Sequence, residues 1–261
     1  MEKQIKQTKQ ATKRLETVKN RYFTDMQKNK YYQDKDLKQA WELACKFYNR
    51  EYMPILLKSG NHKLSKNILI WDIPSIVTCK GACNGCYALK AERIYKNTRI
   101  MRAFHYAITL MALDDTSKKG YLKAVIISEI NRHVVLYSNP ILRLHSSGDL
   151  FNNFYIGFWL EIAHECSNIN IYTYSKQLNN KQIDDINGMF NNFNIIKSMP
   201  CINKKHYINF GGHEYIKKLY DDLKKDGQKA YICSYGTKNE VQCGVNCTAC
   251  LHCSNVLFYK H

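Results

Sequence analysis

Short apolar runs of strand length alternate with longer stretches of helical periodicity along most of the chain. The short runs are rich in Ile, Leu, Tyr and Thr, and polar or glycine-containing turns bound them, which is typical of buried strands. We expect strands at residues 68–73, 141–145, 169–174, 194–198 and 229–234.

Helical patterns occupy the stretches between these strands, where apolar residues recur every three or four positions. Right-handed crossovers between successive strands build a parallel sheet. The pattern therefore predicts an α/β fold, either a partial (β/α) barrel or an open parallel sheet, with N-terminal helices and a C-terminal cysteine-rich module. The expected helices cover residues 36–52, 88–95, 99–113, 122–132, 153–166, 182–190 and 214–225. In the helix at 153–166 we expect the following side chains to face inward: Phe154, Ile156, Phe158, Trp159, Ile162 and Ala163.

Composition divides the chain into three parts. Residues 1–60 form a basic helical segment, residues 61–230 the α/β core, and residues 231–261 a cysteine-rich tail. The beginning of the chain carries one thin apolar stripe among many lysines, which favours a solvated helical arm, with a nucleic-acid-binding or partner-binding arm as the alternative. Pro54 is expected to end the second helix, because proline lacks the backbone donor that a helix requires.

Three cysteines in a C-x3-C-x2-C pattern follow the first predicted strand. Cys79, Cys83 and Cys86 lie in a loop whose glycines can adopt positive φ, so the loop can wrap three sulfurs around one metal centre. Three ligands leave a fourth position open, and the open iron of a [4Fe-4S] cluster can bind a small molecule. The same spacing is typical of radical S-adenosylmethionine enzymes. The alternative is a structural zinc site with a histidine or a remote cysteine as fourth ligand.

A disulfide framework does not suit this chain. The cysteines number 11, which is odd, and the 261 residues begin with no evident secretory signal. Cys45 lies on an apolar helix face and is expected to be a small core residue, and Cys166, at a helix end, is expected to be structural. We therefore expect a reducing, cytoplasmic compartment in which the clustered cysteines bind metal.

A second polar motif follows the strand at 141–145. Ligands bind beyond the carboxyl ends of parallel strands, where Gly148 would let the backbone approach a ligand and Asp149 would accept a hydrogen bond from it. Ser147-Gly148-Asp149 is thus a candidate counterpart of the Gly-Gly-Glu-like motif that holds S-adenosylmethionine in radical enzymes. An N-cap aspartate beside a turn glycine is the alternative. Ser175 and Lys176, which end the next strand, are expected on the same rim as further cofactor-binding residues.

The chain closes with five cysteines in a short span, more than core packing requires. Their inner spacing resembles that of ferredoxins, which favours an iron–sulfur cluster, while C-x2-C units also suit zinc. One or two [4Fe-4S] clusters, or zinc at the second site, are therefore the expected cofactors. The predicted C-terminal ligands are Cys233, Cys243, Cys247, Cys250 and Cys253.

The charge of the chain favours polyanionic partners. Lys and Arg number 39 against 22 Asp and Glu, which gives a formal net charge of +17, and a basic surface attracts nucleic acid. The codon bias of an AT-rich genome accounts for part of the lysine content. Arg93, Arg99 and Arg102, just downstream of the first cysteines, can meet carboxylates or phosphates. The favoured alternative for each is a surface or structural arginine. We expect no membrane partner, because no apolar run has the length of a membrane span.

Several short segments keep a distinctive order along the chain. They are Ser65-Lys66, Asp72-Ile73-Pro74, Thr78-Cys79, Cys86-Tyr87-Ala88, residues 143–150, Tyr155-Ile156, Trp159, residues 172–176 and the terminal C-x2-C-x2-C. In this order they resemble the phage protein family called gene product 88. The resemblance covers roughly residues 64–254 and implies a phage, plasmid or prophage origin in a host cell, with an iron–sulfur site and no particular substrate.

Two hypotheses of function follow. In the first, the chain is a radical S-adenosylmethionine-like enzyme that uses a reductant and generates a 5′-deoxyadenosyl radical for an unknown substrate. In the second, it is a non-enzymatic nucleic-acid-binding or host-directed phage protein whose iron–sulfur or zinc sites stabilise the fold. The sequence predicts no oligomeric state.

Overall fold

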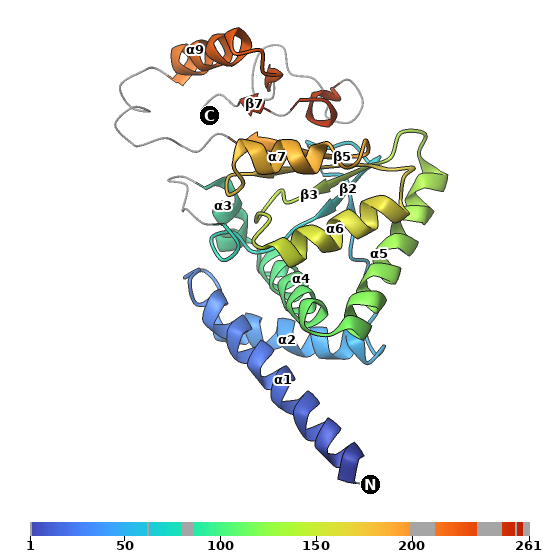
Figure 1. Ribbon diagram of the computed structural model, residues 1–261. Helices are drawn as coiled ribbons and strands as arrows, with labels where there is room; N and C mark the ends of the chain where they lie inside the picture. Colours follow the sequence, from blue (N-terminus) through green and yellow to red (C-terminus); the bar gives the residue numbers. More distant parts are fainter. Residues whose placement is uncertain are drawn as a thin grey trace.

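The strands form one open sheet in the computed structural model of the chain, which describes residues 2–61, 63–79, 86–198, 212–233, 247–253 and 255–257. Their order is β1-β2-β3-β4-β5-β7-β6 (Figure 1). The edge strand β1 is antiparallel to β2, and the other neighbours are parallel. The strands are β1 (Lys58–Ser59), β2 (Ile68–Trp71), β3 (Ile141–Leu144), β4 (Asn170–Ser175), β5 (Phe193–Ser198), β6 (Ala230–Ile232) and β7 (Asn255–Leu257).

Strands β2 to β5 lie side by side in the order of the chain, with helices in each connection. This arrangement confirms the predicted α/β fold, and of the two predicted architectures the structure has the open sheet. Figure 1 shows the yellow α6 and the orange α7 crossing in front of this sheet. The connecting helices are α3 (Tyr87–Ile94), α4 (Lys96–Asp114) and α5 (Thr116–Leu136) between β2 and β3, α6 (Asn153–Glu165) before β4, and α7 (Asn180–Asn187) before β5.

Polar side chains define where several helices begin. Asp115 accepts hydrogen bonds from the N–H groups of Ser117 and Lys118 at the start of α5. Asn152 caps α6, and Asn179 forms a capping box at the start of α7. Such caps satisfy backbone donors that have no partner within the helix.

The two faces of the sheet carry different side chains, because successive residues of a strand point to opposite sides. On the helix face, Leu142 and Leu144 of β3 belong to the main hydrophobic core with Trp71 and Trp159. The opposite face, which we call the cysteine face, has its own cluster, in which Ile68, Ile141 and Tyr172 are buried beneath the C-terminal cysteines. The sheet is thus packed between a hydrophobic cluster on each of its two faces.

Helices α1 (Glu2–Met26) and α2 (Asp34–Tyr48) pack against α4 below the sheet (Figure 1). Residues 9–17 are exposed, but Tyr22 near the end of α1 is fully buried and lies 5.4 Å from the ring of Trp41. The predicted solvated arm is therefore wrong for the end of α1, which belongs to the core. The domain boundary at residue 60 stays a prediction, although buried residues on both sides of it share one cluster.

Three details of the sequence prediction are wrong. Helix α2 ends at Tyr48 with Asn49 as its C-cap, six residues before Pro54. Phe154 is 79% exposed, because the buried stripe of α6 begins one residue later, at Tyr155, and continues every three or four residues. Strands β1 and β7 were not expected, since two or three residues are too few to show an alternating pattern.

The C-terminal part completes the sheet. Strand β7 inserts between β5 and β6, and α9 (Gly212–Lys225) packs on β6 through Ile216 and Leu223. The short helix η1 (Ala249–Leu251) lies over the cysteine face. None of the described helices is both long and apolar enough to cross a membrane.

Candidate metal centre at the carboxyl rim

Thr78 fixes the start of the cysteine loop to the neighbouring strand ends. Its hydroxyl donates to the carbonyl oxygen of Pro74 (2.8 Å) and accepts from the N–H of Asp149 (3.3 Å). The side-chain amide of Gln177 donates to the carbonyl oxygen of Thr78 (2.6 Å). The loop after β2 and the turns after β3 and β4 therefore share one edge, as the sequence predicted. We call this edge the carboxyl rim, comprising residues 72–79, 145–150 and 176–177.

Cys79 and Cys86 lie at the two ends of the cysteine loop, and both are half-buried. Cys86 directly precedes α3. Cys83 lies outside the described residues. Within the part of the chain that the structure describes, no three Cys, His, Asp or Glu side chains are grouped closely enough to hold a metal ion. Metal binding by this loop therefore stays a prediction.

The turn after β3 packs against the base of the loop. Gly148 has a φ of +93°, and a Cβ at this position would lie 2.3 Å from Ile73 Cγ1 and 2.9 Å from Thr78 Oγ1. The close approach that requires glycine is thus an approach to the protein's own chain. The N–H of Ser147 donates to Oδ1 of Asp72 (3.0 Å), which joins the ends of β2 and β3.

Asp149 is 2% exposed, and its carboxylate accepts from the N–H groups of Leu150 (2.7 Å) and Lys176 (2.9 Å). Burial raises the pKa of this carboxyl, while hydrogen bonds from Lys176 and Ser175 act in the opposite direction. Ser175 is also buried, and its hydroxyl accepts from the N–H of Gln177 (3.2 Å). Asp149 and Ser175 therefore brace the rim from inside, whereas the Lys176 side chain is exposed.

A buried ion pair lies beneath the rim. Glu92 on α3 is 0% exposed, and Nη1 of Arg102 on α4 donates to its Oε1 at 3.0 Å. Nη2 of Arg102 lies 3.3 Å from Oδ2 of Asp72. Burial alone would lower the pKa of Arg102, but Asp72 and Glu92 raise it, so the guanidinium is charged. For Arg102 the predicted alternative of a structural arginine is confirmed, because both carboxylates that it meets belong to the protein itself.

Glu92 also connects elements that are distant in the sequence. It accepts from the Ser75 N–H (3.0 Å) and hydroxyl (2.6 Å), from the side-chain amide of Asn29 (2.8 Å) and from the Ser147 hydroxyl (3.3 Å). Asn29 follows α1, so the N-terminal helices are tied to the base of the cysteine loop. The ion pair is thereby supplied with the hydrogen bonds that a buried charge requires.

Two neutral histidines are buried at the base of the rim, with His145 in the rim itself and His105 on α4. Nε2 of His145 is 2.9 Å from the Tyr155 hydroxyl oxygen, and this oxygen accepts a hydrogen bond from Nε1 of Trp71 (2.9 Å). His105 stacks on Trp71 with ring centroids 4.1 Å apart. Burial lowers the pKa of His145 to about 3 and that of His105 to about 4. Both imidazoles are therefore uncharged at neutral pH.

The described C-terminal cysteines lie on the cysteine face of the sheet. Cys233 follows β6, and Cys247 and Cys250 lie just before and within η1. These three cysteines line one cavity against β3 and β4, and Cys253 packs on the same hydrophobic cluster. Cys243 lies outside the described residues. Metal binding here is likewise a prediction.

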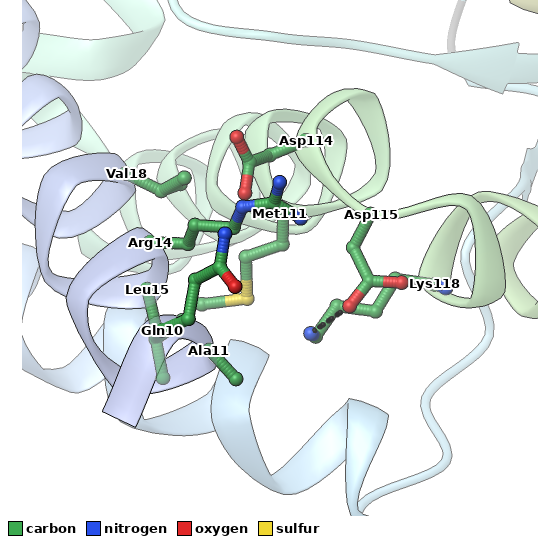
Figure 2. Close-up of a pocket in the computed structure, with 9 residues that line it drawn as sticks. All are labelled: Gln10, Ala11, Arg14, Leu15, Val18, Met111, Asp114, Asp115 and Lys118. Carbon is green, nitrogen blue, oxygen red and sulfur yellow. Dashed lines mark hydrogen bonds and ion pairs between the residues drawn. The ribbon is translucent and has the colours of Figure 1, made fainter. Parts of the chain in front are cut away.

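A further cavity, of about 260 Å³, lies between α1 and the junction of α4 and α5 (Figure 2). Val18 and Met111 contribute an apolar floor, and the Lys118–Asp115 ion pair (2.7 Å) lies at its border. No cysteine lines it. Met111 is nine residues beyond Arg102 on α4, roughly 14 Å along the helix axis, so this cavity is separate from the rim.

Three residues that shape the rim were missed by sequence reasoning. Asp72 directly follows a buried strand, a position that favours ligands and their supports in α/β sheets, so a signal was present. Gln177 adjoins the predicted Ser175-Lys176 pair. Glu92 resembles an ordinary polar helix residue, and only its burial distinguishes it.

Comparison with known proteins agrees with this architecture. A family model described as Gene product 88 matches residues 55–256, from the segment before β1 into β7. No curated protein and no solved structure matches the chain. Because the family match extends over most of the sequence, the chain belongs to the phage gene product 88 family.

Proposed function

We propose that the carboxyl rim is an iron–sulfur centre at which the chain performs radical S-adenosylmethionine-like chemistry. The observation that supports this most directly is the placement of the cysteine loop. The loop leaves the carboxyl end of β2, the first of the parallel strands, and Thr78 ties it to the turns after β3 and β4. Ligands of parallel α/β sheets bind beyond such strand ends.

In this proposal Cys79, Cys83 and Cys86 are the ligands of a [4Fe-4S] cluster with one iron open to S-adenosylmethionine. The donor set fits, because thiolates are the usual ligands of such clusters and Cys79 and Cys86 flank the loop at the rim. With a reductant, this cofactor pair supplies a 5′-deoxyadenosyl radical that abstracts hydrogen from a substrate. The C-terminal cysteines form a second metal centre, with iron–sulfur or zinc as the bound group.

The chain's own residues hold the rim in shape for this ligand. Ser147, Asp149 and Ser175 bond to the protein and position the turns after β3 and β4. Lys176 is exposed beside them, and we assign its ammonium group to the carboxylate of the methionine moiety. Gln177 fixes the carbonyl group that immediately precedes Cys79.

Anaerobic reconstitution with iron and sulfide tests the proposal. We expect an electron paramagnetic resonance spectrum of the reduced cluster that changes when S-adenosylmethionine is added, together with release of 5′-deoxyadenosine. Cys79→Ala and Cys86→Ala should abolish the spectral change and the release of 5′-deoxyadenosine, whereas any iron–sulfur signal from the C-terminal cysteines should persist. Cys45→Ala is the matched control, because Cys45 is also half-buried but lies on α2. Zinc as the sole metal, or a response to S-adenosylmethionine that survives both rim substitutions, would overturn the proposal.

A second candidate function is nucleic-acid contact through the exposed half of α1. Lys9, Lys13 and Arg14 are exposed there, and the whole chain has a formal net charge of +17. Phosphate contacts make affinity fall steeply with salt. Replacing these three residues by Ser should weaken binding to a random-sequence duplex and reduce its salt dependence. Equal binding by the triple variant would exclude this surface.

A further inference from the structure

The tail cysteines meet tyrosine hydroxyls on the cysteine face. The hydroxyl oxygen of Tyr174 on β4 lies 2.8 Å from Sγ of Cys250, and the hydroxyl of Tyr231 on β6 lies 3.7 Å from Sγ of Cys247. Tyr174 is only partly accessible and packs within the cluster of that face. Two sulfurs of the C-x2-C unit therefore each face a phenol group that is fixed by a strand.

The backbone of the same turn is fixed to the sheet. The side-chain amide of Asn194 on β5 donates to the carbonyl oxygens of Cys250 (2.6 Å) and Cys253 (3.2 Å). At the end of β6, the N–H of Cys233 donates to the carbonyl oxygen of Leu257 on β7 (2.8 Å). Strands β5 and β7 thus hold the chain segments that carry these cysteines.

Two basic side chains line the same cavity as the sulfurs. The guanidinium of Arg143 on β3 lies 5.5 Å from the centre of the Tyr174 ring, and Arg143 lines the same cavity as Cys233, Cys247 and Cys250. Lys63 lines this cavity as well. Thiolates bound to a metal carry net negative charge, which cations and hydroxyl donors stabilise. The lining thus suits metal-bound thiolates better than neutral thiols.

We propose that Cys233, Cys247 and Cys250 bind a thiophilic metal centre, zinc or iron–sulfur, and that Tyr174 and Tyr231 are positioning residues that donate hydrogen bonds to its sulfurs. This inference rests on the proposed metal binding by the tail. A metal-bound Cys250 sulfur is a thiolate and can only accept, so the Tyr174 hydroxyl is the donor. The phenol thereby orients Cys250 and lowers the electron density on its sulfur.

Metal loading includes a small movement of the tail. The cavity has a volume of about 30 Å³, and the described side chains do not converge on one point that could hold an ion. Binding therefore draws η1 and the end of β6 together around the metal. Metal affinity and the packing of these segments are then coupled. A substitution that weakens one metal ligand should therefore reduce both the metal affinity and the packing of η1 against β6.

Metal affinity of the full chain, measured by competition with a chromogenic chelator, tests the inference. Removal of a hydrogen bond to a ligand typically weakens metal binding 10- to 100-fold, so we expect Tyr174→Phe to bind roughly ten-fold more weakly than wild type. In an iron-loaded sample the reduction potential should also fall, because one hydrogen bond to sulfur is lost. Tyr231→Phe should show a smaller effect, since its contact is longer.

Tyr48→Phe is the matched control. The Tyr48 hydroxyl donates to the Ile108 carbonyl oxygen (2.7 Å) on the helix side of the molecule, so its loss removes a buried phenol bond without touching a cysteine. Equal affinity and potential in Tyr174→Phe and Tyr48→Phe would overturn the role of Tyr174. Metal content that is unchanged in Cys250→Ser would overturn the tail centre itself.

Two further variants separate this result from the function of the rim. Cys79→Ser should leave the tail metal and its dependence on Tyr174 unchanged, because no described residue of the carboxyl rim lines the tail cavity. Zinc in the tail with no iron in wild type would support the tail centre and contradict the rim cluster. Visible absorption that is lost in Cys250→Ser identifies the tail metal as iron–sulfur.

Discussion

Glu92 accepts a hydrogen bond from Nη1 of Arg102 at 3.0 Å, and both side chains are buried. This pair links α3, which follows the cysteine loop, to α4, the long helix whose His105 stacks on Trp71 of β2. Through Asp72 and Ser147 it also reaches the ends of β2 and β3. The position of the loop thus depends on an ion pair inside the protein.

Removal of one partner of this ion pair should therefore lower the free energy of unfolding substantially. We expect Glu92→Ala to lower the free energy of unfolding by about 3 to 5 kcal/mol, because it leaves the Arg102 charge buried with one carboxylate fewer. Glu165→Ala removes an exposed ion pair with Lys123 (2.6 Å) and should cost less than about 1 kcal/mol. Urea denaturation of both variants provides the comparison. Similar losses in the two variants would mean that the buried ion pair stabilises the fold no more than the exposed one.

The turn at Gly148 allows a second test of the rim. Gly148→Ala places a Cβ 2.3 Å from Ile73 Cγ1 at a φ of +93°, so we expect a loss of about 3 kcal/mol from strain and overpacking. Gly120 lies within α5, and a Cβ there meets nothing within 4 Å. Gly120→Ala should therefore stabilise by about 0.5 to 1 kcal/mol. Thermal unfolding of the two variants should shift in opposite directions.

The elements with a long periodic pattern were predictable from the sequence, and short or contact-dependent features were not. Strands β2 to β5 and helices α4 to α7 follow from apolar spacing, since each has enough residues to show its period. Strand β7 has three residues, and its place between β5 and β6 depends on long-range pairing that no local pattern encodes.

In the candidate site, too, the local motifs were predictable from the sequence and the long-range contacts were not. The sequence predicted that the cysteine loop and the turn at 147–149 share a rim, because both follow buried parallel strands. It did not predict that Asp149 would be buried against the N–H groups of Leu150 and Lys176, since the partners of a turn carboxylate depend on how neighbouring strands end. Residue types identified the motif, and packing determined the contacts of its atoms.

Phe154 and Phe158 provide a test of the helix register in α6. Phe154 is exposed, whereas Phe158 is buried in the main core. Phe158→Ala should lower the free energy of unfolding by about 3 to 5 kcal/mol, and Phe154→Ala should change it by at most about 0.5 kcal/mol. Guanidinium denaturation distinguishes the two. A large loss for Phe154→Ala would show that an unseen partner or a different register covers this side chain.

The buried histidines predict how stability depends on pH. Burial lowers the pKa of His145 to about 3 and that of His105 to about 4, from 6.5. Between those values and 6.5 the unfolded chain binds a proton at each imidazole and the folded chain does not, so stability falls as the pH decreases. Each histidine should contribute a slope approaching about 1.4 kcal/mol per pH unit below pH 6.

The contribution of His145 can be separated by substitution. Burial raises the pKa of Asp149 and Glu129, so these acids take up protons in the folded state and act in the opposite direction. Comparison of wild type with His145→Asn between pH 7 and pH 5 cancels their contribution, because both proteins contain them. The free energy of unfolding of His145→Asn should decline less steeply with acid than that of wild type. Parallel curves would show that His145 is protonated in the folded protein or is accessible to solvent.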